Sequence, residues 1–157
     1  MKKILGFLAL LLLLVIFWRP AVQPTTLNTS LKISDATVAI EIAETPAELT
    51  KGLSGRLTLA ENSGLFFIFP YADTHGIWMK EMNFPIDIIW LNENYQIVAI
   101  KENATPDSYP EVFTPPTPAL YVLEVPADFA KKHKIVAFKK SGQNLEVAML
   151  DPDDIQT

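Results

Sequence analysis

Apolar and polar residues alternate along several short segments of this chain, with the period of two that predicts β-strands. In residues 37–43, Val38, Ile40 and Ile42 fall on one face and polar or small residues on the other. Residues 64–70 are apolar on both faces, as in a strand covered on two sides. Residues 86–91 and 97–101 predict a hairpin across a polar connection. Further strands are predicted at residues 76–82, 119–125, 135–138 and 145–150.

Two short helices are predicted between these strands. Thr45, Pro46 and Glu48 form a capping box with proline at the first helical position, so a helix begins there and ends near Gly52. Residues 126–133 predict the second helix. Asp128 lies near its start and Lys131 and Lys132 near its end, as the helix dipole favours.

Helices do not regularly separate the strands, and this argues against a doubly wound sheet. Residues 102–118 contain five prolines and no apolar run, so we expect one long loop there. The pattern predicts an α+β, mainly β domain: a compact barrel-like or strongly curved antiparallel sheet with two short helices.

The N-terminal segment differs from the rest of the chain. Two lysines precede fifteen uncharged residues, 4–18, and Arg19 and Pro20 follow. The apolar run is shorter than the roughly 20 residues of a typical membrane span. Residues 1–19 therefore predict a signal-anchor or a cleaved signal peptide, with the anchor favoured because no small-residue cleavage site follows.

The remaining chain divides into a linker (20–33), a single β-rich domain (34–150) and an acidic tail (151–157). We expect the domain on the extracytoplasmic side of the cell membrane, held there by residues 4–18, or secreted if the signal is cleaved.

Charge and composition narrow the range of functions. Residues 1–19 hold three basic residues and no acid, so the remaining chain holds 10 basic and 18 acidic residues, a formal charge of −8. Such a surface repels phosphate backbones, and nucleic acid is not an expected partner. The chain has no cysteine, which excludes disulfides and thiolate chemistry. No nucleotide-binding or hydrolase signature is present, and we expect no cofactor.

The segment from His75 to Leu91 concentrates the candidate chemistry. Alternation places Trp78 and Lys80 on one strand face. Asp87 interrupts an apolar run, as does Glu124 later in the chain, and a buried acid must be paired or hydrogen-bonded. One hypothesis makes Asp87 and Glu124 an acid and base, with Lys80 between them. The alternative is a structural ion pair, or bonds from backbone N–H groups.

Arg56, the only arginine after residue 19, is a candidate clamp for a ligand carboxylate; the alternative is a structural bond to a carbonyl or a protein acid. Asp73 and His75 have the spacing of two metal ligands on one strand face. Two ligands are too few, and His133 is expected on a surface helix, so no metal site is predicted. Five aromatic residues are expected in the core more than on a sugar-stacking surface: Phe66, Phe67, Phe69, Trp78 and Trp90.

Four motifs occur in a fixed order. They are G-L-S-G-R at residues 52–56, G-L-F-F-I-F at 64–69, W-M-K at 78–80 with P-I-D-I-I at 85–89, and Y-V-L-E at 121–124. With them the chain resembles the uncharacterised domain-of-unknown-function family numbered 192. The resemblance implies a single compact β-rich domain, often exported and membrane-anchored, and brings no established reaction, cofactor or substrate.

The chain departs from the family pattern at a few positions. Glu81-Met82 stands where the family usually has Asn-Thr, so an activity resting on that pair would be absent here. Asp128 replaces the usual glycine, and Lys134 occupies an expected helix-ending glycine position.

Three functions remain open from the sequence. The leading hypothesis is a domain that binds a small anionic or saccharide-like envelope ligand through Arg56, Trp78, Lys80, Asp87 and Glu124. A second is a hydrolase or lyase acting on cell-wall or sugar material, with Asp87 and Glu124 as acid and base. A third is a protein-interaction scaffold without a ligand site.

Overall fold

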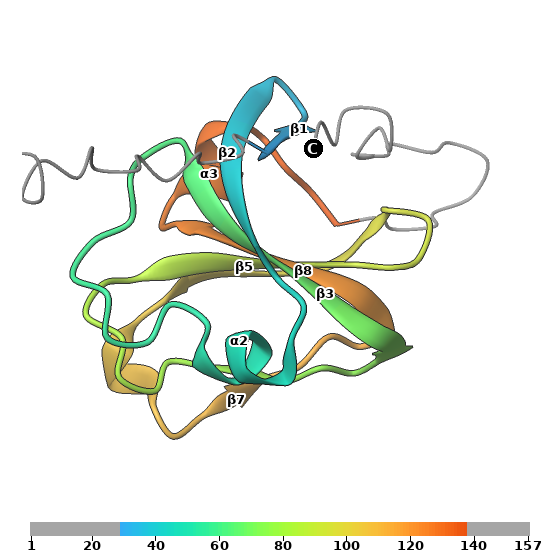
Figure 1. Cartoon of the computed structure of the whole chain (residues 1–157). Coiled ribbons are helices and arrows are strands. Elements are labelled where there is room, and N and C mark those ends of the chain that lie inside the picture. Colours follow the sequence, from blue (N-terminus) through green and yellow to red (C-terminus); the bar gives the residue numbers. More distant parts are fainter. Residues whose placement is uncertain (1–28, 138–157) are drawn as a thin grey trace, which may run out of the picture.

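The computed structural model describes residues 29–137, which form a strongly twisted six-stranded sheet, a two-stranded sheet and two short helices (Figure 1). The large sheet has the order β1-β2-β3-β8-β5-β6. Its strands are β1 (Thr29–Ile33), β2 (Ala36–Ala43), β3 (Ser63–Asp73), β5 (Ile86–Leu91), β6 (Ile97–Ala104) and β8 (Ala119–Pro126). The other elements are β4 (Ile77–Trp78), β7 (Val112–Phe113), α2 (Pro46–Lys51), α3 (Phe129–Lys132) and the 3-10 turn η1 (Pro106–Ser108).

The mainly β fold with two short helices is confirmed, with two refinements. The sheet is open, because β1 and β6 form its edges. It is also mixed, because β2 and β3 run parallel while the other pairs are antiparallel. A parallel pair needs a crossover, and the segment containing α2 supplies it between β2 and β3.

The two faces of the sheet carry separate hydrophobic cores, and Figure 1 shows α2 and α3 on opposite sides of it. The α3 face packs Leu31, Phe66, Leu123 and Val125 with α3 residues. The α2 face packs Leu53, Phe67, Ile88, Trp90 and Val122. Central strands β5 and β8 therefore have apolar residues on both sides.

The first predicted helix begins as the sequence indicates. The backbone N–H of Thr45 donates to Glu48 Oε2 at 2.9 Å, and the N–H of Glu48 donates to Thr45 Oγ1 at 3.4 Å. The capping box is confirmed, and Gly52 ends the helix.

Three segments differ from prediction. The expected linker reached residue 33, but Thr29–Ile33 form β1, because Leu31 and Ile33 bury completely against β2. The strand expected at 76–82 is limited to β4, because the chain turns at Glu81, whose φ is 57°. The expected loop at 102–118 is not structureless: it contains the end of β6, η1, and β7, which pairs with β4.

The C-terminal elements are also shorter than expected. Helix α3 covers four residues, and residues 135–137 form no strand. The apolar segment 4–18, most of the linker, the strand expected at 145–150 and the acidic tail lie outside the described residues. Between residues 29 and 137, no helix is long and apolar enough to span a membrane.

Candidate functional site

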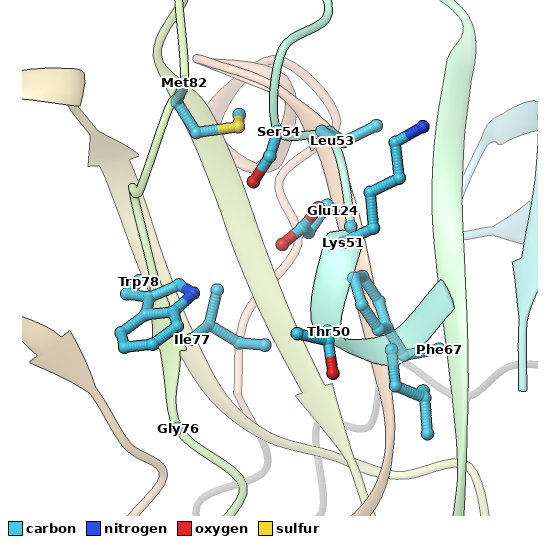
Figure 2. Close-up of a pocket in the computed structure, with 12 residues that line it drawn as sticks. Thr50, Lys51, Leu53, Ser54, Phe67, Gly76, Ile77, Trp78, Met82 and Glu124 are labelled. Carbon is cyan, nitrogen blue, oxygen red and sulfur yellow. The ribbon is translucent and has the colours of Figure 1, made fainter. Parts of the chain in front are cut away.

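A pocket opens on the α2 face between α2 and β4, with a cavity of about 40 Å³ (Figure 2). This space admits a group of a few non-hydrogen atoms. Its lining comes from α2 and the following turn, from β3, β4 and β8, and from the turn after β4. The residues are Leu49, Thr50, Lys51, Gly52, Leu53, Ser54, Phe67, Gly76, Ile77, Trp78, Met82 and Glu124.

Gly52 allows the chain to leave α2 across the floor of the pocket. Its φ of 50° lies in the left-handed region. A Cβ at this position would lie 3.3 Å from Phe67 Cζ and 3.9 Å from Glu124 Oε2. Glycine therefore lets the turn pass close to Glu124 without covering it.

Glu124 forms the polar part of the floor. Its exposed fraction is 5%, and its Oε2 has no hydrogen-bond partner among the described residues. Burial raises the pKa of this carboxyl group to about 8, and the nearby charge of Arg56 only partly opposes that shift. Glu124 is consequently a neutral carboxylic acid near pH 7, able to donate one hydrogen bond.

Trp78 forms the rim of the pocket. The expectation that Trp78 belongs to the core is wrong, because its exposed fraction is 46%. Phe66, Phe67 and Trp90 are buried, as expected for core residues. The ammonium group of Lys80 lies 5.9 Å from the Trp78 ring centroid. Figure 2 shows Trp78 and Glu124 on different sides of the same opening. An exposed indole beside a buried acid suits a ligand with an apolar face and polar substituents.

Arg56 is engaged by a protein acid. Its two terminal nitrogens contact the two carboxylate oxygens of Glu41, at 2.5 and 2.8 Å. This is the structural alternative considered for Arg56. The guanidinium holds the pKa of Glu41 below its usual range.

Asp87 has a structural environment as well. It is fully buried, Oδ1 accepts from the Asn103 N–H and Oδ2 accepts from the Ala130 N–H, both at 2.8 Å. These bonds join β5 to β6 and to α3. The alternative in which backbone N–H groups satisfy Asp87 is confirmed.

The structure does not bring the five predicted site residues together. Ile88 is the register partner of Glu124, and Asp87 is the partner of Val125. Because neighbouring residues on a strand face opposite sides, Asp87 points to the α3 face and Glu124 to the α2 face. The two cannot serve as acid and base on one substrate. Lys80 is exposed and forms no salt bridge to either acid.

The two histidines are held by protein groups. His75 Nε2 lies 2.8 Å from the Tyr71 carbonyl oxygen, and its ring stacks on Phe69. His133 Nδ1 lies 2.9 Å from Asp35. In the part of the chain that the structure describes, no three His, Asp or Glu residues are placed to hold one metal ion.

Sequence reasoning missed part of the pocket, namely Lys51, Gly52, Ser54 and Met82. The segment around Gly52 and Ser54 was interpreted as the end of a helix and as part of the G-L-S-G-R motif, not as the lining of a pocket. Its glycine at the helix end was the available signal. Which strand the turn would cover depends on the crossover, and this cannot be read from local pattern.

Two solved structures are similar to this chain. A protein of unknown function from Novosphingobium aromaticivorans DSM 12444 has a TM-score of 0.66 and 27% identity, covering 75% of this chain and 88% of that one. A Sinorhizobium meliloti 1021 protein, described as a "putative transcription regulator", has a TM-score of 0.64 and 28% identity, covering 76% and 92%. No curated protein matches the sequence significantly.

The profile of a family described as Uncharacterized ACR matches residues 29–146, from the first strand of the sheet past the last helix. The match spans most of the chain and agrees with the motifs at Arg56, Lys80, Asp87 and Glu124. The chain belongs to the DUF192 family of uncharacterised proteins.

Proposed function

We propose that this protein is a membrane-tethered, extracytoplasmic binding domain whose α2-face pocket holds a small saccharide-like or anionic ligand of the cell envelope. The observation that carries the proposal is Glu124 Oε2 at the floor of the pocket, which has no hydrogen-bond partner within residues 29–137. A buried polar group without a partner costs free energy, and a ligand that supplies the partner recovers it. Trp78 at the rim adds a surface for a sugar ring.

The proposed location is supported by the pattern of residues 2–18. The lysines at positions 2 and 3 and the apolar residues 4–18 are the pattern of a signal-anchor. Ten residues separate this run from β1, which supports a short tether between membrane and domain.

The geometry disfavours two other functions. A hydrolase or lyase using Asp87 and Glu124 lacks a shared site, because the two acids lie on opposite faces of the sheet. The S. meliloti protein carries the description "putative transcription regulator". The formal charge of −8 after residue 19 opposes DNA binding by this chain, since a DNA-binding surface must attract phosphates.

A protein-interaction role is the second candidate, and one observation favours it. Tyr109 and Val112 have exposed fractions of 46% and 50%, and both lie beside Trp78. This apolar surface adjoins the pocket, so a partner could cover both.

The proposal is tested by titrating the full-length chain in detergent with monosaccharides and small organic anions, using calorimetry. We expect at least one sugar to bind with a Kd of millimolar or below, and Trp78→Ala to weaken it about ten-fold, roughly 1.4 kcal/mol. Tyr71→Ala is the matched control, because this exposed aromatic residue does not line the pocket.

If no member of the panel binds, the proposal is wrong. If binding occurs and Trp78→Ala and Tyr71→Ala weaken it equally, the ligand site is elsewhere. Co-precipitation of a protein partner by the wild-type chain, lost when Tyr109 and Val112 are substituted, would favour the interaction role.

A further inference from the structure

We propose that the ligand places an uncharged hydrogen-bond acceptor, such as a sugar acetamido or hydroxyl oxygen, on the floor of the α2-face pocket, where the carboxyl group of Glu124 donates to it. This choice of ligand class rests on the proposed binding function. The inference identifies the ligand group that contacts Glu124, which the exposed Trp78 alone does not determine.

Apolar walls around Glu124 isolate its carboxyl group. Phe67, Leu53 and Ile77 line the same cavity and are buried. The desolvation that raises the pKa of Glu124 to about 8 also penalises any other charge placed there. A neutral acid in such a site can donate to a neutral acceptor without burying a charge.

The basic residues near Glu124 come from α2 and the turn that follows it. Lys51 lies at the end of α2, and Arg56 follows in the next turn, where Glu41 of β2 compensates its charge. Strands β3 and β4 contribute Phe67, Ile77 and Trp78 to the pocket, none of which titrates near pH 7. On β5, Asp87 points to the other face.

The two pocket hydroxyl groups are placed to accept hydrogen bonds from hydroxyl groups of a sugar. Ser54 Oγ donates to the Lys80 carbonyl oxygen, and Thr50 Oγ1 donates to the Pro46 carbonyl oxygen, both at 2.8 Å. Their protons are therefore used within the protein, and their oxygens can only accept from a ligand. Glu124 supplies a donor, while Figure 2 shows the indole nitrogen of Trp78, a second donor, on the ring edge turned toward the pocket.

Charged ligand groups fit this floor less well. A carboxylate on the floor would lie against Glu124, where Glu41 already compensates the charge of Arg56, and the two carboxylates would repel once Glu124 ionised. An ammonium group would require a buried ion pair, and it would also meet the positive charge of Arg56. An amide or hydroxyl oxygen avoids both costs.

The test uses three sugars that share one ring: N-acetylglucosamine (neutral), glucuronate (anionic) and glucosamine (cationic at pH 6), whose affinities are compared with one another at pH 6. Each is titrated by calorimetry into the full-length chain at pH 6 and pH 9.5. We expect N-acetylglucosamine to bind best, and its affinity to fall about ten-fold or more at the higher pH as Glu124 ionises.

Two variants isolate the donor. Glu124→Gln keeps an N–H donor, so it should bind N-acetylglucosamine at both pH values without the pH dependence. Glu124→Met preserves volume without hydrogen-bonding capacity and should bind weakly at both. Thermal unfolding of each variant confirms that it is folded.

Stronger binding of glucuronate or glucosamine would overturn the proposed ligand class. So would wild-type binding that ignores pH, or a Glu124→Met variant that binds like wild type. In each of these cases sugar binding at Trp78 would survive. If none of the three sugars binds and the wider panel also fails, the binding function is wrong and this inference is wrong with it.

Discussion

At three positions where this chain departs from its family pattern, the backbone has a positive φ. Glu81, Asp128 and Lys134 have φ values of 57°, 65° and 51°. The left-handed region costs most residues about 1–2 kcal/mol, whereas glycine and asparagine enter it readily. The family's asparagine or glycine at these positions therefore meets a backbone requirement, and Glu81 need not replace a catalytic group.

Glu81→Asn should stabilise the protein by about 0.5–1 kcal/mol, because asparagine tolerates this φ better than glutamate. Urea unfolding of the two proteins side by side measures the difference. Lys80→Asn, one position earlier and outside the positive-φ set, should give no such gain. A destabilised Glu81→Asn variant would contradict the backbone explanation.

Glu124 also makes stability depend on pH. Its pKa rises from an ordinary value of about 4.3 in the unfolded chain to about 8 in the folded chain. Within that window the folded state binds more protons, so stability falls as the pH rises, and below it the full contribution is present.

Relative to Glu124→Gln, the wild type should lose on the order of a few kcal/mol of unfolding free energy between pH 5 and pH 9. Urea midpoints across this range give the difference, and subtracting the variant removes the titration of other groups. Parallel pH curves for the two proteins would show that the buried carboxyl does not titrate as described.

At the level of elements, Asp87 acts as a connector. One carboxylate on the central strand β5 binds a backbone N–H of edge strand β6 and another in α3. Without it, the buried N–H of Ala130 would have no partner, and the N–H of Asn103, an exposed residue, would lose a part-buried bond. A buried donor without a partner costs about 1–3 kcal/mol.

Asp87→Ala should therefore destabilise the fold by about 3 kcal/mol or more, and Asp87→Asn by less, since one oxygen remains. Chemical unfolding measures both. Sugar affinity at low temperature serves as the control readout and should stay unchanged in the folded fraction. A loss below about 1 kcal/mol for the alanine variant would remove this role from Asp87.

The elements themselves show what local pattern can predict. Alternation located β2, β5, β6 and β8, and the capping box at Thr45 located α2, because both signals depend on near neighbours in the chain. Strand β1 was missed because its five residues follow a stretch rich in proline and threonine, and their burial depends on pairing with β2. The pairing of β4 with β7 is likewise a long-range contact.

The candidate site illustrates the same limit at the scale of the whole molecule. Asp87 and Glu124 were correctly identified as acids inside apolar runs, and both are buried. Their grouping failed because a one-residue offset in the β5–β8 register sends them to opposite faces. Strand register is set by the assembled sheet, so no local pattern could have shown which acid lines the pocket.

Because the two faces of the sheet are separate, the same substitution at neighbouring residues should affect stability and ligand binding differently. Phe66 and Phe67 are adjacent on β3 and almost fully buried, at 1% and 2% exposure. Phe66 stacks on Tyr121 on the α3 face, whereas Phe67 lines the α2-face pocket. The same substitution at both positions therefore separates stability from binding.

Phe66→Leu and Phe67→Leu should each lower the unfolding free energy by about 1–3 kcal/mol, because both remove buried aromatic contacts. Only Phe67→Leu should change the affinity for N-acetylglucosamine, since only Phe67 contributes to the wall of the pocket. Unfolding in urea and calorimetric titration of the same samples measure the two effects. Equal losses of affinity in the two variants would contradict this prediction. They would mean that packing on the α3 face affects the pocket on the α2 face.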